Sequence, residues 1–199
     1  MLASSFTKDK IEAGLDEAGR GCLAGPVVAA AVILPKDFIH PDLDDSKKIS
    51  AKKRMLLREV VLENALAYAV VEVQAEEIDK INILQASFTA MHRCIDKLKI
   101  KPELLLIDGN RFRPYDGIPD ECIVKGDGKF LSIAAASILA KTHRDMLMEK
   151  LSEDFPEYGW ERNAGYPTKA HRAAIAKFGT TPWHRTSFKL LPEQKTIDF

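Results

Sequence analysis

The sequence is poor in cysteine and has no long hydrophobic run. Its 3 cysteines, Cys22, Cys94 and Cys122, are far apart and form no CxxC pair or Cys/His metal motif. Reduced thiols are therefore expected, not a disulfide framework or a zinc site. The N-terminal segment lacks an apolar stretch of signal-peptide length, and the longest apolar run, 27–34, is too short to span a bilayer. We expect a cytoplasmic protein without a membrane partner.

Net charge is also absent, because 29 basic residues balance 29 acidic residues. The balance removes any overall attraction to a polyanion, but the distribution is uneven. Residues 46–58 carry six basic side chains and no acidic one, and residues 158–191 carry six basic side chains against Glu161 alone. This pattern predicts two local basic surfaces on a neutral chain.

Hydrophobic patterning predicts an α/β protein. Apolar runs predict strands at 11–16, 27–34, 67–73 and 104–108. Helical spacing and capping residues predict helices at 51–66, 82–98, 132–151 and from Thr168 to about 178. The first two strands are expected to pair antiparallel across a glycine-rich turn. The fully apolar strand 104–108 (LLLID) suits a parallel strand buried on both faces.

The order of these elements predicts a mixed sheet flanked by helices, with a helical C-terminal extension. We expect one domain, with a core at about 10–155, an extension at about 156–191 and a tail at 192–199, acting as a monomer. Two helices show candidate buried faces. The residues expected on these faces are Met55, Leu56, Val60 and Leu66 in the first helix, and Leu84, Phe88, Met91, Ile95 and Leu98 in the second.

Four carboxylates stand at positions where chemistry is plausible. Asp16 and Glu17 end a strand and precede Gly19-Arg20-Gly21, although adjacent carboxylates are commonly just solvated surface. Asp108 ends the apolar strand, where it either makes a turn with Gly109 or needs a cationic partner. Asp127 lies in a Gly-Asp-Gly turn before an alanine-rich helix, which it could cap, or it could ligate a metal.

Taken together, carboxylates without a His or Cys cluster suit a hard cation such as Mg²⁺ or Mn²⁺. Such ions bind oxygen ligands and keep water and substrate phosphate in their coordination shells. Acidic residues between basic flanks suit a polyanionic substrate. The pattern is typical of two-metal phosphodiester hydrolysis.

The glycine-rich turn superficially resembles a dinucleotide-binding fingerprint. That fingerprint must open a helix, whereas Pro26 and a β-branched run follow here, so a nucleotide-binding enzyme is disfavoured. A Gly-Arg-Gly turn instead exposes backbone groups and one guanidinium that could read a sugar hydroxyl and a phosphate.

Two further segments could contact a nucleic acid. Tyr166, in a loop beside basic residues, could stack on a sugar or base, or it could be a partly buried core residue. His184 and Arg185 offer phosphate donors, although His184 suits a structural role equally well.

Several segments in order along the chain resemble bacterial ribonuclease HII. The resemblance covers about residues 10 to 190, and GLDEAGRG together with AAASILAK is its most specific part. The other matching segments are DSKKIS, LLLIDGN, VKGDGKFLSIAAASILAKTHRD, FPEYGW, NAGYPTKAH and HRTSF. The resemblance implies an RNase H-like fold with a central five-stranded mixed sheet. Only 15 residues precede Asp16, so the resemblance favours type II over the related type III enzymes, which carry an extra N-terminal domain.

The resemblance also implies an activity and a set of site residues. The activity is hydrolysis 5′ of ribonucleotides in RNA–DNA hybrids, and of single ribonucleotides in duplex DNA, leaving 3′-hydroxyl and 5′-phosphate ends. Asp16, Glu17, Asp108 and Asp127 match the catalytic carboxylates that hold Mn²⁺ or Mg²⁺. Gly19, Arg20 and Gly21 match the sensor of the 2′-hydroxyl. Tyr166 matches a tyrosine that stacks on the deoxyribose 3′ of the ribonucleotide, and Lys47 matches a phosphate contact.

Two features depart from or lie outside the resemblance. Cys22, Leu23, Ala164 and Pro167 differ from residues frequent in the family, which affects loop conformation and fine specificity. The tail 194–199 (QKTIDF) has the pattern Q-x-x-I-x-F, which resembles a peptide that docks on the bacterial sliding clamp, although a frayed tail is the simpler interpretation.

Two other interpretations stay open at this stage. A resolvase- or transposase-type nuclease of the same fold would use similar carboxylates but ignore the 2′-hydroxyl. A non-catalytic nucleic-acid-binding module would keep the carboxylates for structure alone. Metal-dependent cleavage of ribose-containing duplexes separates all three.

Overall fold

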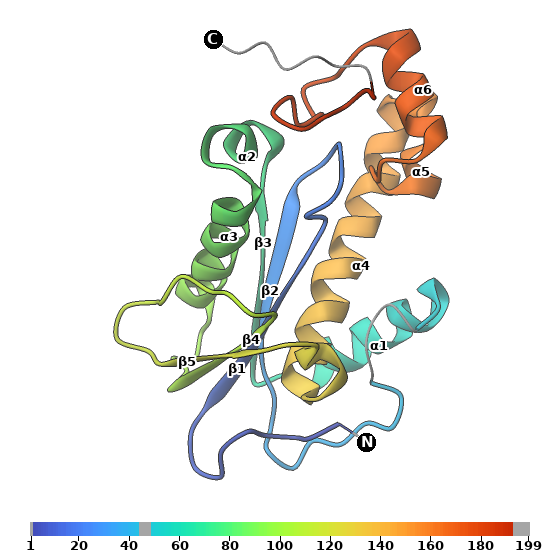
Figure 1. Ribbon diagram of the computed structural model, residues 1–199. Coiled ribbons are helices and arrows are strands. Elements are labelled where there is room, and N and C mark those ends of the chain that lie inside the picture. The colour runs from blue at the N-terminus through green and yellow to red at the C-terminus, as the bar shows by residue number, and fades with distance from the viewer. Residues whose placement is uncertain (1, 44–48, 193–199) are drawn as a thin grey trace.

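A five-stranded mixed sheet forms the centre of the molecule (Figure 1). The computed structural model describes residues 2–43 and 49–192. The strand order is β3-β2-β1-β4-β5, with β1, β2 and β3 antiparallel and β4 and β5 parallel to β1. The strands are β1 (Glu12–Ala18), β2 (Val27–Ile33), β3 (Ala67–Val73), β4 (Leu104–Asp108) and β5 (Asp120–Ile123).

One face of the sheet is covered by α3 (Ile83–Lys97), which follows the short α2 (Ala75–Ile81). Ala13 and Leu15 of β1 pack on this side with Met91 and Ile95 of α3 in one core cluster. The helix begins where the Asn82 side chain accepts hydrogen bonds from the backbone N–H groups of the first turn. The apolar face expected for this helix is confirmed at its centre, where Phe88, Met91 and Ile95 are buried.

The opposite face is covered by α4 (Leu131–Asp154) and α1 (Ala51–Asn64). Alanines at 134–136 bring the backbone of α4 close to the sheet. Gly14 of β1 is required at this contact, because a Cβ atom there would lie 2.2 Å from the backbone carbon of Ser132. This close contact places Ser137 and Lys141 of α4 around the same pocket as Asp16 of β1.

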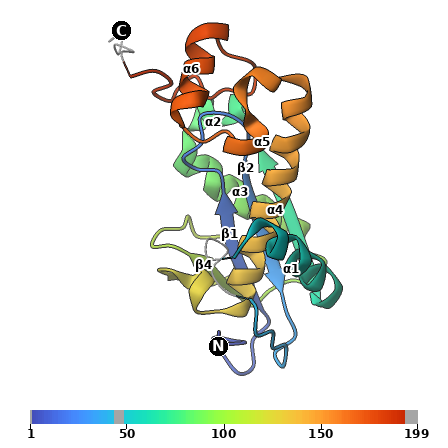
Figure 2. The ribbon, with the colours of Figure 1, turned by 90° about the vertical axis from the view of Figure 1, so that its right-hand side faces the viewer.

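The C-terminal extension packs on the far end of α4 (Figure 2). It comprises η2 (Pro156–Tyr158), α5 (Trp160–Asn163) and α6 (Lys169–Phe178), and α6 begins where Thr168 Oγ1 accepts from His171 N at 3.1 Å. Trp160, Tyr158 and Ile175 share a core cluster with Leu23 and Met148. The extension is thereby joined to the glycine-rich turn. The division near residue 155 stays a prediction.

The structure corrects some expectations. The predicted apolar face of the helix at 51–66 is wrong: Leu56 is 64% and Leu66 is 56% exposed, and the helix buries Leu57 and Val61 instead. Patterning also missed α2 and β5 as elements, whereas the strands at 11–16, 27–34, 67–73 and 104–108 are confirmed within a few residues. Across residues 2–43 and 49–192, no helix has the length and apolar character needed to cross a membrane.

Candidate metal and nucleic-acid site

Strand pairing brings Asp16 and Asp108 together. Leu15 of β1 pairs with Ile107 of the parallel strand β4, so the next residue on each strand lies beside its neighbour. The carboxyl ends of parallel strands meet at one edge of a sheet, where open α/β folds bind ligands. Both aspartates therefore point into a single site from different segments of the chain.

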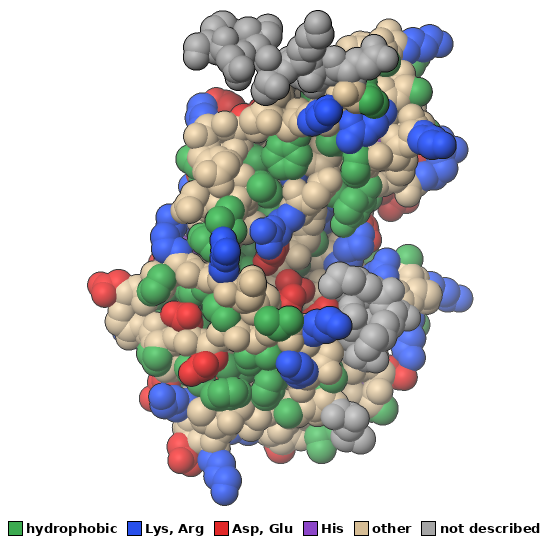
Figure 3. All heavy atoms as spheres, viewed as in Figure 1, with side chains coloured by type: hydrophobic (Ala, Val, Ile, Leu, Met, Phe, Trp, Pro, Cys, Tyr) green, Lys and Arg blue, Asp and Glu red, His purple; other side chains and the backbone are tan. Residues whose placement is uncertain are grey.

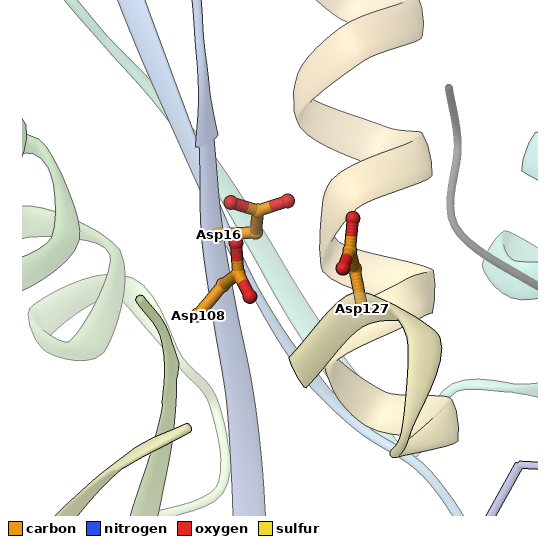
Figure 4. A group of neighbouring side chains, drawn as sticks. All are labelled: Asp16, Asp108 and Asp127. Carbon is orange, nitrogen blue, oxygen red and sulfur yellow. The ribbon is translucent and has the colours of Figure 1, made fainter. Parts of the chain in front are cut away.

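Asp127 completes this group from the turn before α4. It lies in the 3-10 turn η1 (Gly126–Gly128), which Asp108 anchors by accepting a hydrogen bond from Gly126 N at 2.7 Å. Carboxylate oxygens of Asp16, Asp108 and Asp127 lie within 4.8 Å of one another (Figure 4). We call this group the aspartate cluster.

The electrostatics of the aspartate cluster favour a cation. Burial raises the pKa of Asp16 well above its ordinary value, and the charges of Glu17 and Asp108 raise it further. The side chain of Ser137 hydrogen-bonds Asp16 and opposes this shift. Three oxygen donors in one small volume form the ligand set that Mg²⁺ or Mn²⁺ prefers, so the residues fit such an ion.

Glu17 lies beside the aspartate cluster instead of within it. Successive residues of a strand point to opposite faces, and Asp16 faces α4, so Glu17 turns toward α3. There it accepts a hydrogen bond from Arg20 Nη1 at 3.1 Å and borders a second hollow with Phe88 and Asn110. Its role as a metal ligand stays a prediction.

A pocket of about 280 Å³ joins the aspartate cluster to the glycine-rich turn. Figure 3 shows acidic atoms in the middle of this face with basic atoms around them. Both Tyr166 and the Gly19-Arg20-Gly21 segment border the pocket, and their predicted substrate contacts stay predictions. The lining residues are Asp16, Glu17, Ala18, Gly19, Arg20, Gly21, Arg54, Asp108, Ser137, Lys141 and Tyr166.

Three polar residues of this pocket were not predicted as site residues from the sequence. Ser137 and Lys141 lie one helical turn apart on α4, and Arg54 comes from α1. The signal was available for the first two, because residues at i and i+4 share a helix face and the alanine-rich motif contains both. Lys141 and Arg54 add positive charge opposite the carboxylates, and both pair with Asp145.

The structure contradicts direct phosphate contacts from His184 and Arg185. Both side chains are buried. Arg185 Nη1 donates to the backbone oxygen of Arg20 at 2.9 Å, and its Nε and Nη2 donate to that of Gly25 at 3.0 and 2.9 Å. A buried guanidinium requires such partners, which leave it no contact with a solvent-borne phosphate. Arg185 supports the glycine-rich turn from beneath.

The second basic surface is correspondingly smaller than expected. Arg172 also donates to backbone oxygens, those of Lys189 and Leu190. Lys47 and the tail 194–199 lie outside the described residues, so their predicted contacts stay predictions.

A buried histidine pair supports the extension and carries a pH prediction. Burial lowers the pKa of His171. The pKa of His184 is lowered to about 4, mainly by burial and to a smaller extent by the charge of the neighbouring His171. Unfolding returns both to about 6.5, so the unfolded chain binds more protons below that pH. Their stabilising contribution is complete above pH 6.5 and is lost as the pH falls toward the folded pKa values.

We expect the Tm to fall by several degrees between pH 6.5 and 5, and His184→Gln to flatten this slope. A Tm that rises between pH 6.5 and 5 would contradict this stabilising role of the neutral histidines.

Comparison with solved structures defines the class of protein. The ribonuclease H2 of Pyrococcus horikoshii is 26% identical, with a TM-score of 0.76 over 90% of this chain and 94% of that chain. The ribonuclease HII of Archaeoglobus fulgidus, solved in complex with PCNA, is 29% identical, with a TM-score of 0.75 over 94% and 98%. The fold and the acidic pocket define a metal-dependent endonuclease with an RNase H-like fold.

Sequence comparison then identifies the family. The family model for ribonuclease HII matches residues 13–191. The ribonuclease HII of Parabacteroides distasonis is 62% identical over 199 residues, covering 100% of both chains. That of Bacteroides thetaiotaomicron is 63% identical over 200 residues with the same coverage. The chain belongs to the ribonuclease HII family, which confirms the resemblance inferred from its motifs.

Proposed function

We propose that this protein hydrolyses the phosphodiester 5′ of ribonucleotides, both in RNA–DNA hybrids and at single ribonucleotides in duplex DNA. The products carry 3′-hydroxyl and 5′-phosphate ends. One observation carries the proposal: Asp16 and Asp108 of the aspartate cluster border the same pocket as the Gly-Arg-Gly turn. A group that breaks a phosphodiester and a group that can read a sugar hydroxyl therefore face one nucleotide. Such an activity serves ribonucleotide removal during DNA replication and repair.

In this proposal the aspartate cluster, with Glu17 beside it, holds one or two Mg²⁺ or Mn²⁺ ions. When bound, the ions supply activation of water and stabilisation of the leaving 3′-oxygen. The chain's own groups orient the substrate. Arg54 and Lys141 face the backbone phosphates, and backbone groups of residues 19–21 face the 2′-hydroxyl. The ribose hydroxyl is a recognition element and not the nucleophile.

Three labelled duplexes test the proposal: all DNA, DNA with one ribonucleotide, and an RNA–DNA hybrid, each with Mg²⁺ and with Mn²⁺. Cutting only the ribose-containing duplexes, 5′ of the single ribonucleotide, is the expected result. Cleavage of the all-DNA duplex would instead favour a nuclease that ignores the 2′-hydroxyl. Absence of metal-dependent cleavage would contradict the proposal outright.

Replacement of Arg20 by alanine tests the sensor. Its side chain is 52% exposed and pairs only at the surface with Glu17, so the fold should lose less than about 1 kcal/mol. We expect kcat/KM on the single-ribonucleotide duplex to fall by about tenfold, as the loss of one charge-assisted contact to the substrate implies. The measurement is kcat/KM on the single-ribonucleotide duplex, with Arg162→Ala as a surface control. An unchanged kcat/KM would contradict the role of Arg20.

We also propose that the tail 194–199 docks on a sliding clamp. The Q-x-x-I-x-F pattern supports this, as does the archaeal relative that was solved with PCNA. A pull-down of the clamp with the full chain and with a chain lacking the last six residues tests it. Equal capture by both chains would contradict the proposal.

A further inference from the structure

His171 of α6 is connected to the backbone of Tyr166 in a defined protonation state. The indole Nε1 of Trp160, which can only donate, lies 3.1 Å from His171 Nε2. His171 Nε2 is therefore an acceptor, and the neutral ring carries its proton on Nδ1. That N–H donates to the backbone oxygen of Tyr166 at 3.0 Å.

His184 extends this chain of hydrogen bonds with the opposite tautomer. Its Nδ1 accepts from the backbone N–H of Thr181 at 2.9 Å, so its proton lies on Nε2. That Nε2 lies 3.2 Å from His171 Nε2, which accepts from it as well as from Trp160. A second proton on either ring would place two N–H groups against each other. Both rings are buried, and the lowered pKa values of both agree with the neutral state.

The histidine pair acts on a loop that contacts the glycine-rich turn. Leu23 N donates to Gly165 O at 2.8 Å, and a Cβ atom on Gly165 would lie 2.4 Å from Ala24 O. Besides His171, the Tyr166 carbonyl accepts only a local bond from Thr168 N among the described residues. His171 thus links the interior of the extension to the Tyr166 carbonyl, while the Tyr166 N–H donates to Asn163 O at 2.8 Å. The tyrosine side chain, 40% exposed, enters the pocket of the aspartate cluster.

We propose that His171 and His184 are positioning residues for substrate recognition: as a neutral pair of opposite tautomers, they fix the Tyr166 backbone and thereby place its ring at the junction 3′ of the ribonucleotide. The inference rests on the proposed role of Tyr166. It assigns the extension a part in specificity in addition to its part in stability.

A double-mutant cycle tests this coupling. His171→Leu, Tyr166→Ala and the double variant are compared by kcat/KM on the single-ribonucleotide duplex and on the RNA–DNA hybrid. We call the ratio of the two values the junction preference. His171→Leu should lower the junction preference by about tenfold, since small displacements of positioning groups have effects of this size. In the Tyr166→Ala background it should change the ratio by less than about twofold, because residues that act through one another are not additive.

Further variants separate positioning from folding. His171→Asn keeps an N–H near the Nδ1 position and should restore part of the junction preference. If His171→Leu does not fold, His171→Asn replaces it in the test. His92→Leu is the matched control, because His92 Nε2 also bonds a backbone oxygen, that of Arg113, at 2.7 Å. It should leave the ratio unchanged. Imidazole ¹⁵N chemical shifts at neutral pH should report a proton on His171 Nδ1 and on His184 Nε2.

Three results would overturn the inference. A proton on His171 Nε2 or on His184 Nδ1, which includes a charged ring, would remove its basis. An unchanged junction preference in folded His171→Leu, or equal losses in both backgrounds, would leave the histidines a structural role alone. An unchanged junction preference in Tyr166→Ala would contradict the proposed role of Tyr166, and the inference would fail with it. A lowered preference in Tyr166→Ala with an unchanged one in His171→Leu would contradict the inference alone.

Discussion

Replacing Asp108 with asparagine is expected to reduce metal-dependent cleavage by roughly 10³-fold or more, while duplex binding stays measurable. Asparagine has nearly the same shape, and its Oδ1 can still accept the hydrogen bond from Gly126 N. It removes one negative charge from three carboxylates that lie within 4.8 Å. The variant therefore changes the affinity for the ion much more than the local structure. Cleavage of an end-labelled duplex and binding by fluorescence anisotropy measure the two effects.

Asp120→Asn serves as the matched control, because Asp120 pairs with Leu105 at the other end of the β4–β5 ladder. It should cleave like the wild type. Retention of activity within tenfold in Asp108→Asn would contradict the assignment of the aspartate cluster. Loss of binding together with loss of activity would indicate misfolding, which circular dichroism detects.

Replacing Arg144 with methionine is expected to destabilise the fold by about 3–5 kcal/mol, since it leaves buried carbonyl groups without donors. Arg144 is 1% exposed. It donates from Nε to Pro26 O at 2.9 Å, from Nη1 to Ala164 O at 2.7 Å and from Nη2 to Ala24 O at 2.9 Å. One side chain of α4 thus joins the glycine-rich turn to the loop that contains Ala164 and Tyr166. The Tm should fall by roughly 6–20 °C.

Arg162→Met provides the comparison, because the Arg162 side chain is 82% exposed and pairs with Glu161. Its effect should stay within about 0.5 kcal/mol. Thermal unfolding followed by circular dichroism measures both variants. Equal Tm values for Arg144→Met and the wild type would contradict the role of Arg144 as the joint between these segments.

The proximity of the three aspartates could be anticipated from the sequence because it follows from local rules. The apolar strand ending in Asp108 has a pattern that suits a buried parallel strand, and parallel neighbours bring their carboxyl ends together. The Gly-Asp-Gly turn before an alanine-rich helix places Asp127 at the same edge. Strand alternation also explains why Glu17 faces away from Asp16, although the sequence pattern groups all four carboxylates.

The remaining errors concern residues whose environment depends on distant segments. Arg185 has the composition of a phosphate-binding residue, but it bonds Gly25, 160 residues away in sequence. No local pattern reveals such a partner. Helix α1 buries only Leu57 and Val61, a stripe too narrow to distinguish by periodicity from its exposed apolar residues. Strand β5 (DECI) lacks a buried residue altogether and therefore lacks the apolar signal of a strand.

Calorimetric titration of Mn²⁺ tests whether the three aspartates from β1, β4 and η1 form one metal site. The titration is made with the wild type and with the variants Asp16→Asn, Asp108→Asn and Asp127→Asn. We expect the wild type to bind Mn²⁺ and each of the three variants to bind it much more weakly. Asp120→Asn should bind Mn²⁺ as the wild type does. Unchanged Mn²⁺ affinity in the three cluster variants would contradict a metal site shared by these aspartates.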